Sequence, residues 1–150
     1  MINVEELMVG NVVSTNGTPC NMNVGGIYKV IATYCEDTLD DMKGIARLKG
    51  KDFTVSAWCE FLEPVILTET LLLSLGFTAN SHIFYKTLGN YKIVLVDNKY
   101  GGFSLFIDDD NNERDTYEKV VLDLNYQIKY VHKLQNLIYM ITNLHLNFEF

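Results

Sequence analysis

Four basic residues fall within nine positions of an otherwise acidic chain and are the best candidates for binding chemistry in this sequence. They are Lys43, Arg47, Lys49 and Lys51. All four have odd numbers, so in a β-strand their side chains share one face. There, ammonium and guanidinium groups could bind phosphate or another small anion. Lysines also protect exposed edge strands against aggregation, and we favour this second interpretation, which needs no ligand.

Tyrosine stands next to lysine at five places, and two of these tyrosines are candidates for stacking on a base. Tyr85 precedes Lys86, and Tyr91 precedes Lys92. An aromatic face with a nearby cation can hold a nucleobase and its phosphate. Adjacent residues of a strand point to opposite faces, however, so most such pairs are expected to be one core tyrosine and one solvated lysine.

A third group of candidates lies on a helix that is predicted to end near Thr142. Apolar residues recur at helical spacing from Val131 to Ile141, and His132, Gln135 and Asn136 lie away from this stripe. These polar side chains could form a binding surface, a local hydrogen-bond network or a merely solvated patch. We favour the two interpretations that need no ligand.

No motif in the sequence identifies a metal or a reaction. The turn from Asp108 to Glu113 begins like an EF-hand loop, but its sixth position is Glu113 rather than Gly and its twelfth is Lys119 rather than Glu. The three cysteines form no Cys-x-x-Cys pair, and no nucleophile, Walker or dinucleotide motif is present. We therefore expect no metal and no cofactor, and a binding protein rather than an enzyme.

The composition is that of an acidic, globular protein. The 150 residues are 48% hydrophobic and carry a net charge of −7. A general nucleic-acid binder needs a basic face that displaces counterions, so this charge argues against one. The first residues lack the pattern of a signal peptide, and no apolar run is long enough to span a membrane. We expect a cytoplasmic protein without membrane contact.

Residues 1–65 are predicted to form a β-rich lobe that contains the basic cluster. Short runs of β-branched and aromatic residues alternate there with turn signals such as Asn16-Gly17 and Gly50-Lys51-Asp52. This close spacing favours a small barrel, and an SH3-like barrel is the specific expectation.

Residues 66–150 are predicted to form an α+β lobe. Thr68 should cap a short helix that ends at Leu75, where Gly76 and Phe77 suit a Schellman ending. An antiparallel sheet should follow, with strands at His82–Thr87, Tyr91–Val96, Phe103–Ile107 and Lys119–Leu124. A helix and a strictly alternating final strand, Leu144–Phe150, close the chain. The predicted fold class is α+β, with both lobes sharing a core.

The ending Ile128-Lys-Tyr-Val-His-Lys-Leu-Gln-Asn-Leu137 resembles that of a family of small uncharacterised proteins from Bacteroides-type gut bacteria, their prophages and their phages. The segments from Glu5 to Val13 and from Glu63 to Phe77 fit that family more loosely. In the family the ending continues into a Gly-containing turn, where this chain has Met140-Ile-Thr-Asn-Leu144. The resemblance implies a phage or mobile-element accessory protein, acting in the host cytosol if a phage encodes it, and implies no reaction.

The sequence and the resemblance together support three hypotheses of function. The first is a non-catalytic phage or prophage accessory protein that binds a small anionic ligand, most concretely a counter-defence protein that sequesters a host nucleotide-type signal. The second is an acidic adaptor or inhibitor of a host protein, and the third is a small hydrolase of nucleotide signals. Homo-oligomerisation is left open. The candidate ligand contacts are Arg47, Lys49, Lys51, Tyr85, Tyr91, His132, Gln135 and Asn136.

Overall fold

The computed structural model describes residues 1–16, 26–37, 42–99, 101–109, 120–121 and 127–149. These residues form two antiparallel five-stranded sheets with short helices, so the predicted α+β class is confirmed. They divide into two compact units. Residues 1–66 and 130–136 form the first unit, and residues 67–129 and 137–149 form the second. No helix in the described part of the chain is long and apolar enough to cross a membrane.

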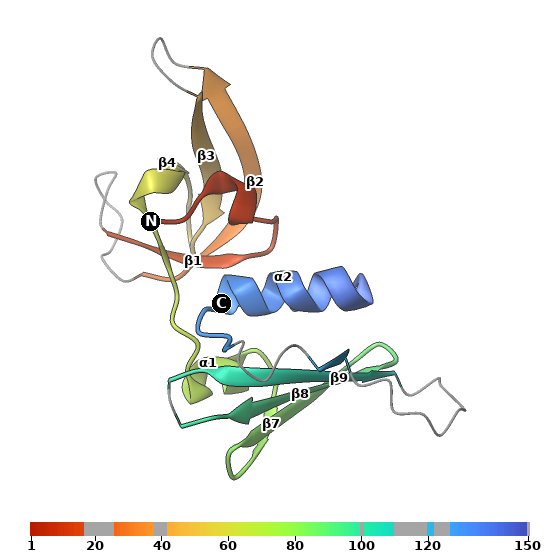
Figure 1. Cartoon of the computed structure of the whole chain (residues 1–150). Helices are drawn as coiled ribbons and strands as arrows, with labels where there is room; N and C mark the ends of the chain where they lie inside the picture. The colour runs from red at the N-terminus through yellow and green to blue at the C-terminus, as the bar shows by residue number, and fades with distance from the viewer. Residues whose placement is uncertain (17–25, 38–41, 100, 110–119, 122–126, 150) are drawn as a thin grey trace. The chain divides into compact units, whose positions relative to one another are not determined.

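The first unit is built on a sheet with the strand order β4-β3-β2-β1-β5 (Figure 1). Its strands are β1 (Val12–Thr15), β2 (Tyr28–Asp37), β3 (Met42–Lys49), β4 (Thr54–Trp58) and β5 (Leu62–Pro64). The 3-10 helix η1 (Val4–Glu6) precedes β1, and a second one, η2 (Cys59–Phe61), joins β4 to β5. No closed barrel forms among the described residues.

The inner face of this sheet carries the apolar core of the first unit. Its members on the strands include Val13, Tyr28, Val30, Ala46, Leu48, Ala57 and Leu62. Gly44 lies on β3 where η1 packs, and a Cβ at this position would collide with the side chain of Val4. The glycine therefore allows η1 to approach the sheet closely.

Helix α1 (Glu69–Ser74) opens the second unit and has the predicted ends. The Thr68 hydroxyl accepts a hydrogen bond from the N–H of Leu71 (3.3 Å). At the other end, Gly76 has a φ of 80°, and the N–H of Phe77 donates to the carbonyl of Leu72 (3.0 Å). This is the Schellman ending that the sequence predicts, and it needs a residue that tolerates positive φ.

The predicted antiparallel meander is confirmed, with strand ends shifted by one or two residues. The sheet has the order β10-β9-β8-β7-β6. Its strands are β6 (Thr78–Asn80), β7 (Ile83–Leu88), β8 (Tyr91–Asp97), β9 (Phe103–Asp109) and β10 (Val120–Val121). The short β6 was not predicted, and the remaining positions of the predicted strand Lys119–Leu124 lie outside the described residues. One face buries Phe84, Ile93, Leu95, Leu105 and Ile107.

Helix α2 (Val131–Thr142) matches the predicted terminal helix, but the predicted final strand is wrong. Residues 144–149 are assigned to no strand, although Leu146 and Phe148 are buried and His145, Asn147 and Glu149 are exposed. Alternating burial requires only an apolar surface on one side, whereas a strand also requires a regular ladder of backbone hydrogen bonds. The alternating sequence pattern indicates the apolar surface but does not indicate whether the backbone hydrogen bonds form.

The buried stripe of α2 can be tested with two substitutions on the same helix. Ile138 is completely buried, whereas Met140 is 76% exposed. We expect Ile138→Ala to lower the free energy of unfolding by about 2–4 kcal/mol because it leaves a cavity. Met140→Ala should change it by less than about 0.5 kcal/mol. Urea unfolding followed by circular dichroism measures both, and equal midpoints for the two variants would contradict the core assignment.

Candidate functional site

The basic residues of β3 lie on a central strand and not on an edge. β3 pairs with β2 on one side and with β4 on the other. Lys43, Arg47 and Lys49 are exposed on one face of the sheet, while Lys51 lies in the turn after β3. The edge-protection interpretation is therefore wrong, because the backbone of β3 already has partners on both sides.

A row of two aromatic side chains crosses the same face. Ile45 on β3 pairs with Tyr34 on β2 and with Trp58 on β4. Tyr34 is exposed, Trp58 is half-buried and Ile45 is buried. The residues that share this surface, which we call the outer face, are Lys29, Ala32, Tyr34, Lys43, Ile45, Arg47, Lys49, Thr54, Ser56 and Trp58.

Two further rows of the outer face bring cations next to the aromatic row. Arg47 pairs with Ala32 and Ser56, and Lys49 pairs with Lys29 and Thr54. Lys29 and Tyr34 share the face despite the opposite parity of their numbers, because a register shift lies between Val30 and Ala32. The bulge thus completes the basic surface with a lysine from β2.

The four cations of the outer face differ in their partners. The Nζ of Lys43 lies 3.4 Å from an Oε of Glu60 and 5.6 Å from the centre of the Trp58 ring. Lys29, Arg47 and Lys49 have no ion pair within the part of the chain that the structure describes. The Tyr34 hydroxyl donates to the Ser56 hydroxyl (3.4 Å), beside Arg47. An uncompensated positive patch therefore adjoins the aromatic row on the side of Arg47.

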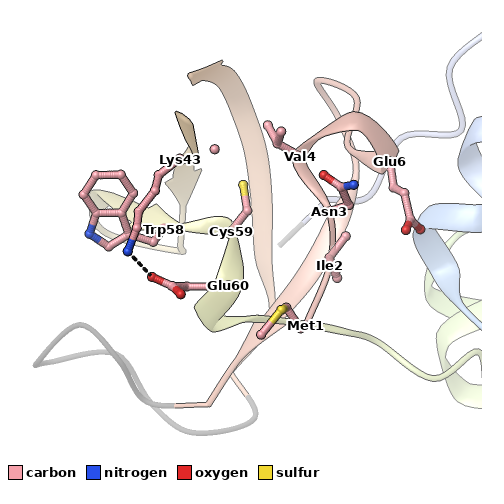
Figure 2. A pocket seen from close by; sticks show the side chains of 10 residues that line it. Met1, Ile2, Asn3, Val4, Glu6, Lys43, Trp58, Cys59 and Glu60 are labelled. Carbon is pink, nitrogen blue, oxygen red and sulfur yellow. Dashed lines mark hydrogen bonds and ion pairs between the residues drawn. The ribbon is translucent and has the colours of Figure 1, made fainter. Parts of the chain in front are cut away.

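A cavity of about 480 Å³ lies beside Trp58 (Figure 2). Its walls include Ile2, Val4, Lys43, Trp58, Cys59 and Glu60. Burial, with a smaller contribution from the nearby Cys35, raises the pKa of the Cys59 thiol to about 11. Cys59 is therefore protonated at neutral pH and is not an activated nucleophile.

The structure does not bring Tyr85 and Tyr91 together. Both belong to the second unit, with Tyr85 on β7 opposite Val94 and Tyr91 on β8 opposite Leu88. This register puts the two rings on opposite faces of the sheet, and Tyr85 is the more exposed. They do not form a stacking pair.

Gln135 and Asn136 of α2 form a local hydrogen-bond network with the chain before β1. Gln135 accepts from the N–H of Val12 and donates to the carbonyl of Gly10, both at 2.9 Å. Asn136 donates to the carbonyl of Glu6 (2.7 Å) and accepts from the side chain of Asn11 (2.8 Å). Of the three interpretations left open by the sequence, the structure supports the network.

His132 lies beside this network and is 2% exposed. Its Nε2 lies 3.9 Å from an Oε of Glu6, and its buried Nδ1 has no hydrogen-bond partner among the described residues. Burial, with a smaller effect of Lys133, lowers the pKa of His132 to about 4, against the opposing effect of Glu6. A hydrogen bond from Lys133 holds the pKa of Glu6 below its ordinary value. His132 is therefore neutral at pH 7.

The sequence prediction missed three cationic or aromatic members of the outer face: Lys29, Tyr34 and Trp58. No sequence signal marked the bulge that turns Lys29 outward. The described residues contain no cluster of three His, Cys, Asp or Glu side chains that could hold a metal ion. Residues 110–113 of the acidic turn lie outside the described residues.

No protein-family model, curated protein or solved structure matches the chain.

The network of Gln135 can be tested by truncation. Gln135→Ala leaves the N–H of Val12 and the carbonyl of Gly10 without these partners, so we expect a loss of about 2–4 kcal/mol in the free energy of unfolding. Asn147→Ala, at an exposed position, should change it by less than about 0.5 kcal/mol. Urea unfolding measures both variants, and a Gln135→Ala protein as stable as the wild type would show that the network contributes nothing.

His132 should make stability depend on pH. Its pKa is about 4 in the folded protein and 6.5 in the unfolded chain, so protons bind the unfolded state first as the pH falls. Stability is complete above pH 6.5 and is lost toward pH 4, with about 2 kcal/mol lost between pH 7 and pH 5. Urea unfolding of wild type and His132→Gln over this range is the measurement. A variant with the same pH slope as wild type would contradict the assignment.

Proposed function

We propose that this protein acts by binding, and that its outer face holds a small anionic ligand that carries an aromatic ring. A nucleotide-type molecule has both features. The observation that carries the proposal is the pair of aromatic side chains, Tyr34 and Trp58, in one row of the sheet with Arg47 in the next. The rings can stack on a base, and the guanidinium can form paired hydrogen bonds with a phosphate.

The rest of the unit favours binding over turnover. Cys59 is the nucleophilic side chain nearest to Trp58 in the sequence, and its raised pKa keeps it protonated. His132, another candidate acid or base, is buried beside Glu6 and is 2% exposed. The residues that reach solvent on the outer face are cations, hydroxyls and rings, which suit recognition.

We propose that the first unit is a member of the SH3-like class. The supporting observations are the consecutive pairing of β1 to β4, the placement of β1 between β2 and β5, and the 3-10 helix η2 between β4 and β5. In this arrangement the outer surface of β2, β3 and β4 is free for a ligand, while the inner surface is filled by the core.

The resemblance of the C-terminal segment supplies a biological context for this binding. A phage or prophage accessory protein that binds a nucleotide without converting it would remove that nucleotide from host signalling. We therefore propose counter-defence sequestration as the role, because stoichiometric binding needs no catalytic group.

Trp58 is the only tryptophan of the chain and offers a direct test of this site. A panel of cyclic nucleotides, nucleoside phosphates and ADP-ribose derivatives, titrated with excitation at the tryptophan band, should include ligands that quench Trp58 in the micromolar range. For such a ligand we expect Arg47→Ala and Tyr34→Ala each to weaken binding by about three- to tenfold. Isothermal calorimetry gives the same constants without relying on fluorescence.

Lys92→Ala is the matched control, because Lys92 is an exposed strand lysine of the other sheet. It should bind every ligand as the wild type does. Absence of binding across the panel at high micromolar concentrations would falsify the proposal. Binding that Arg47→Ala and Lys92→Ala weaken equally would assign the effect to net charge and not to the outer face.

A further inference from the structure

We infer that the outer face is arranged for a nucleoside polyphosphate, with the base on the aromatic row and the phosphate chain running toward Lys29 and Lys49. The inference rests on the proposed function and adds a ligand class and a direction of binding. It follows from the order of the rows on this face and from the different partners of its cations.

The spacing of the rows suits such a ligand. Residues of one face follow each other every second position, so the row of Arg47 lies about 6.8 Å from the row of Ile45, and the row of Lys49 lies about 6.8 Å further. A base on the aromatic row would bring the first phosphate of an extended nucleotide close to Arg47. A second and a third phosphate would then reach Lys49 and Lys29, which pair with each other across β3 and β2.

The direction follows from the charges at the two ends of the face. On one side of the aromatic row, Lys43 is paired with Glu60 and lies over the Trp58 ring. A phosphate there would approach a carboxylate as well as an ammonium group. On the other side, Arg47, Lys49 and Lys29 have no acidic partner among the described residues. The unpaired positive charge therefore lies on one side of the rings only. In a nucleoside polyphosphate the negative charge likewise lies on one side of the base.

The base itself would be held by its ring faces. Tyr34 and Trp58 flank the buried Ile45, and stacking on such rings tolerates any base. We therefore expect adenine and guanine nucleotides to bind alike. Affinity should increase with the number of phosphates, because each further phosphate group would reach a further cation of the outer face.

The test is a calorimetric series with adenosine, AMP, ADP and ATP at low salt and without magnesium, repeated with GTP and with inorganic triphosphate. We expect affinity to rise by about tenfold from AMP to ATP, since exposed charge pairs each contribute modestly. ATP and GTP should agree within about threefold, and inorganic triphosphate should bind more weakly than ATP. The rise should shrink at high salt, which screens exposed charges.

Variants separate the roles along the ligand. Lys49→Ala should remove about half of the difference in binding free energy between ATP and AMP, because Lys29 remains, and should leave AMP binding unchanged. Tyr34→Ala should weaken both nucleotides equally. Lys92→Ala should alter neither. Equal affinities for AMP and ATP, or a Lys49→Ala variant that retains the full difference, would overturn the polyphosphate inference while leaving the proposed nucleotide site intact. Failure of every nucleotide to bind would instead overturn the proposed function.

Discussion

The side-chain amide of Gln135 is the interaction on which the first unit most depends. It binds the N–H of Val12 and the carbonyl of Gly10, as the backbone of a neighbouring strand would. Because each satisfied buried hydrogen bond contributes about 0.5–1.5 kcal/mol and each orphaned partner costs more, this contact fixes where β1 begins. β1 in turn pairs with both β2 and β5, and β2 carries Lys29 and Tyr34 to the outer face. The helix residues that looked like a candidate site therefore act through the strands they position.

The sequence predicted the elements well where one local rule decides them. Thr68 and Gly76 specify the ends of α1, and the apolar spacing from Val131 specifies α2. The prediction failed where a second segment decides the outcome. The alternation after Leu144 indicates one-sided burial, but whether a strand forms depends on a partner that no local pattern encodes. The polar residues of α2 look solvated in the sequence, because their partners lie more than a hundred positions away.

The candidate site shows the same division. The common face of Lys43, Arg47 and Lys49 follows from parity alone and was predicted. That they lie on a central strand depends on the pairing of β4 with β3, which the sequence does not show. That Lys29 shares their face depends on a bulge in β2, which shifts the alternation of side chains by one residue. Tyr85 and Tyr91 were candidates because each is next to a lysine in the sequence, but neighbours in a strand point to opposite faces. The aromatic residues that share a face with the cations, Tyr34 and Trp58, come from β2 and β4.

The charge distribution is the reason why we propose a small anion, and not a long nucleic acid, as the ligand. A net charge of −7 repels an extended polyanion, whereas the outer face presents a local positive field within reach of a single nucleotide. The most direct test is a ¹⁵N–¹H correlation spectrum recorded during titration with ATP. Amide shifts should centre on Tyr34, Arg47 and Lys49 and on the indole N–H of Trp58, with β7 and β8 unchanged. Shifts that centre on the second sheet, or a spectrum unchanged at millimolar ATP, would contradict the assignment of the outer face as the binding site.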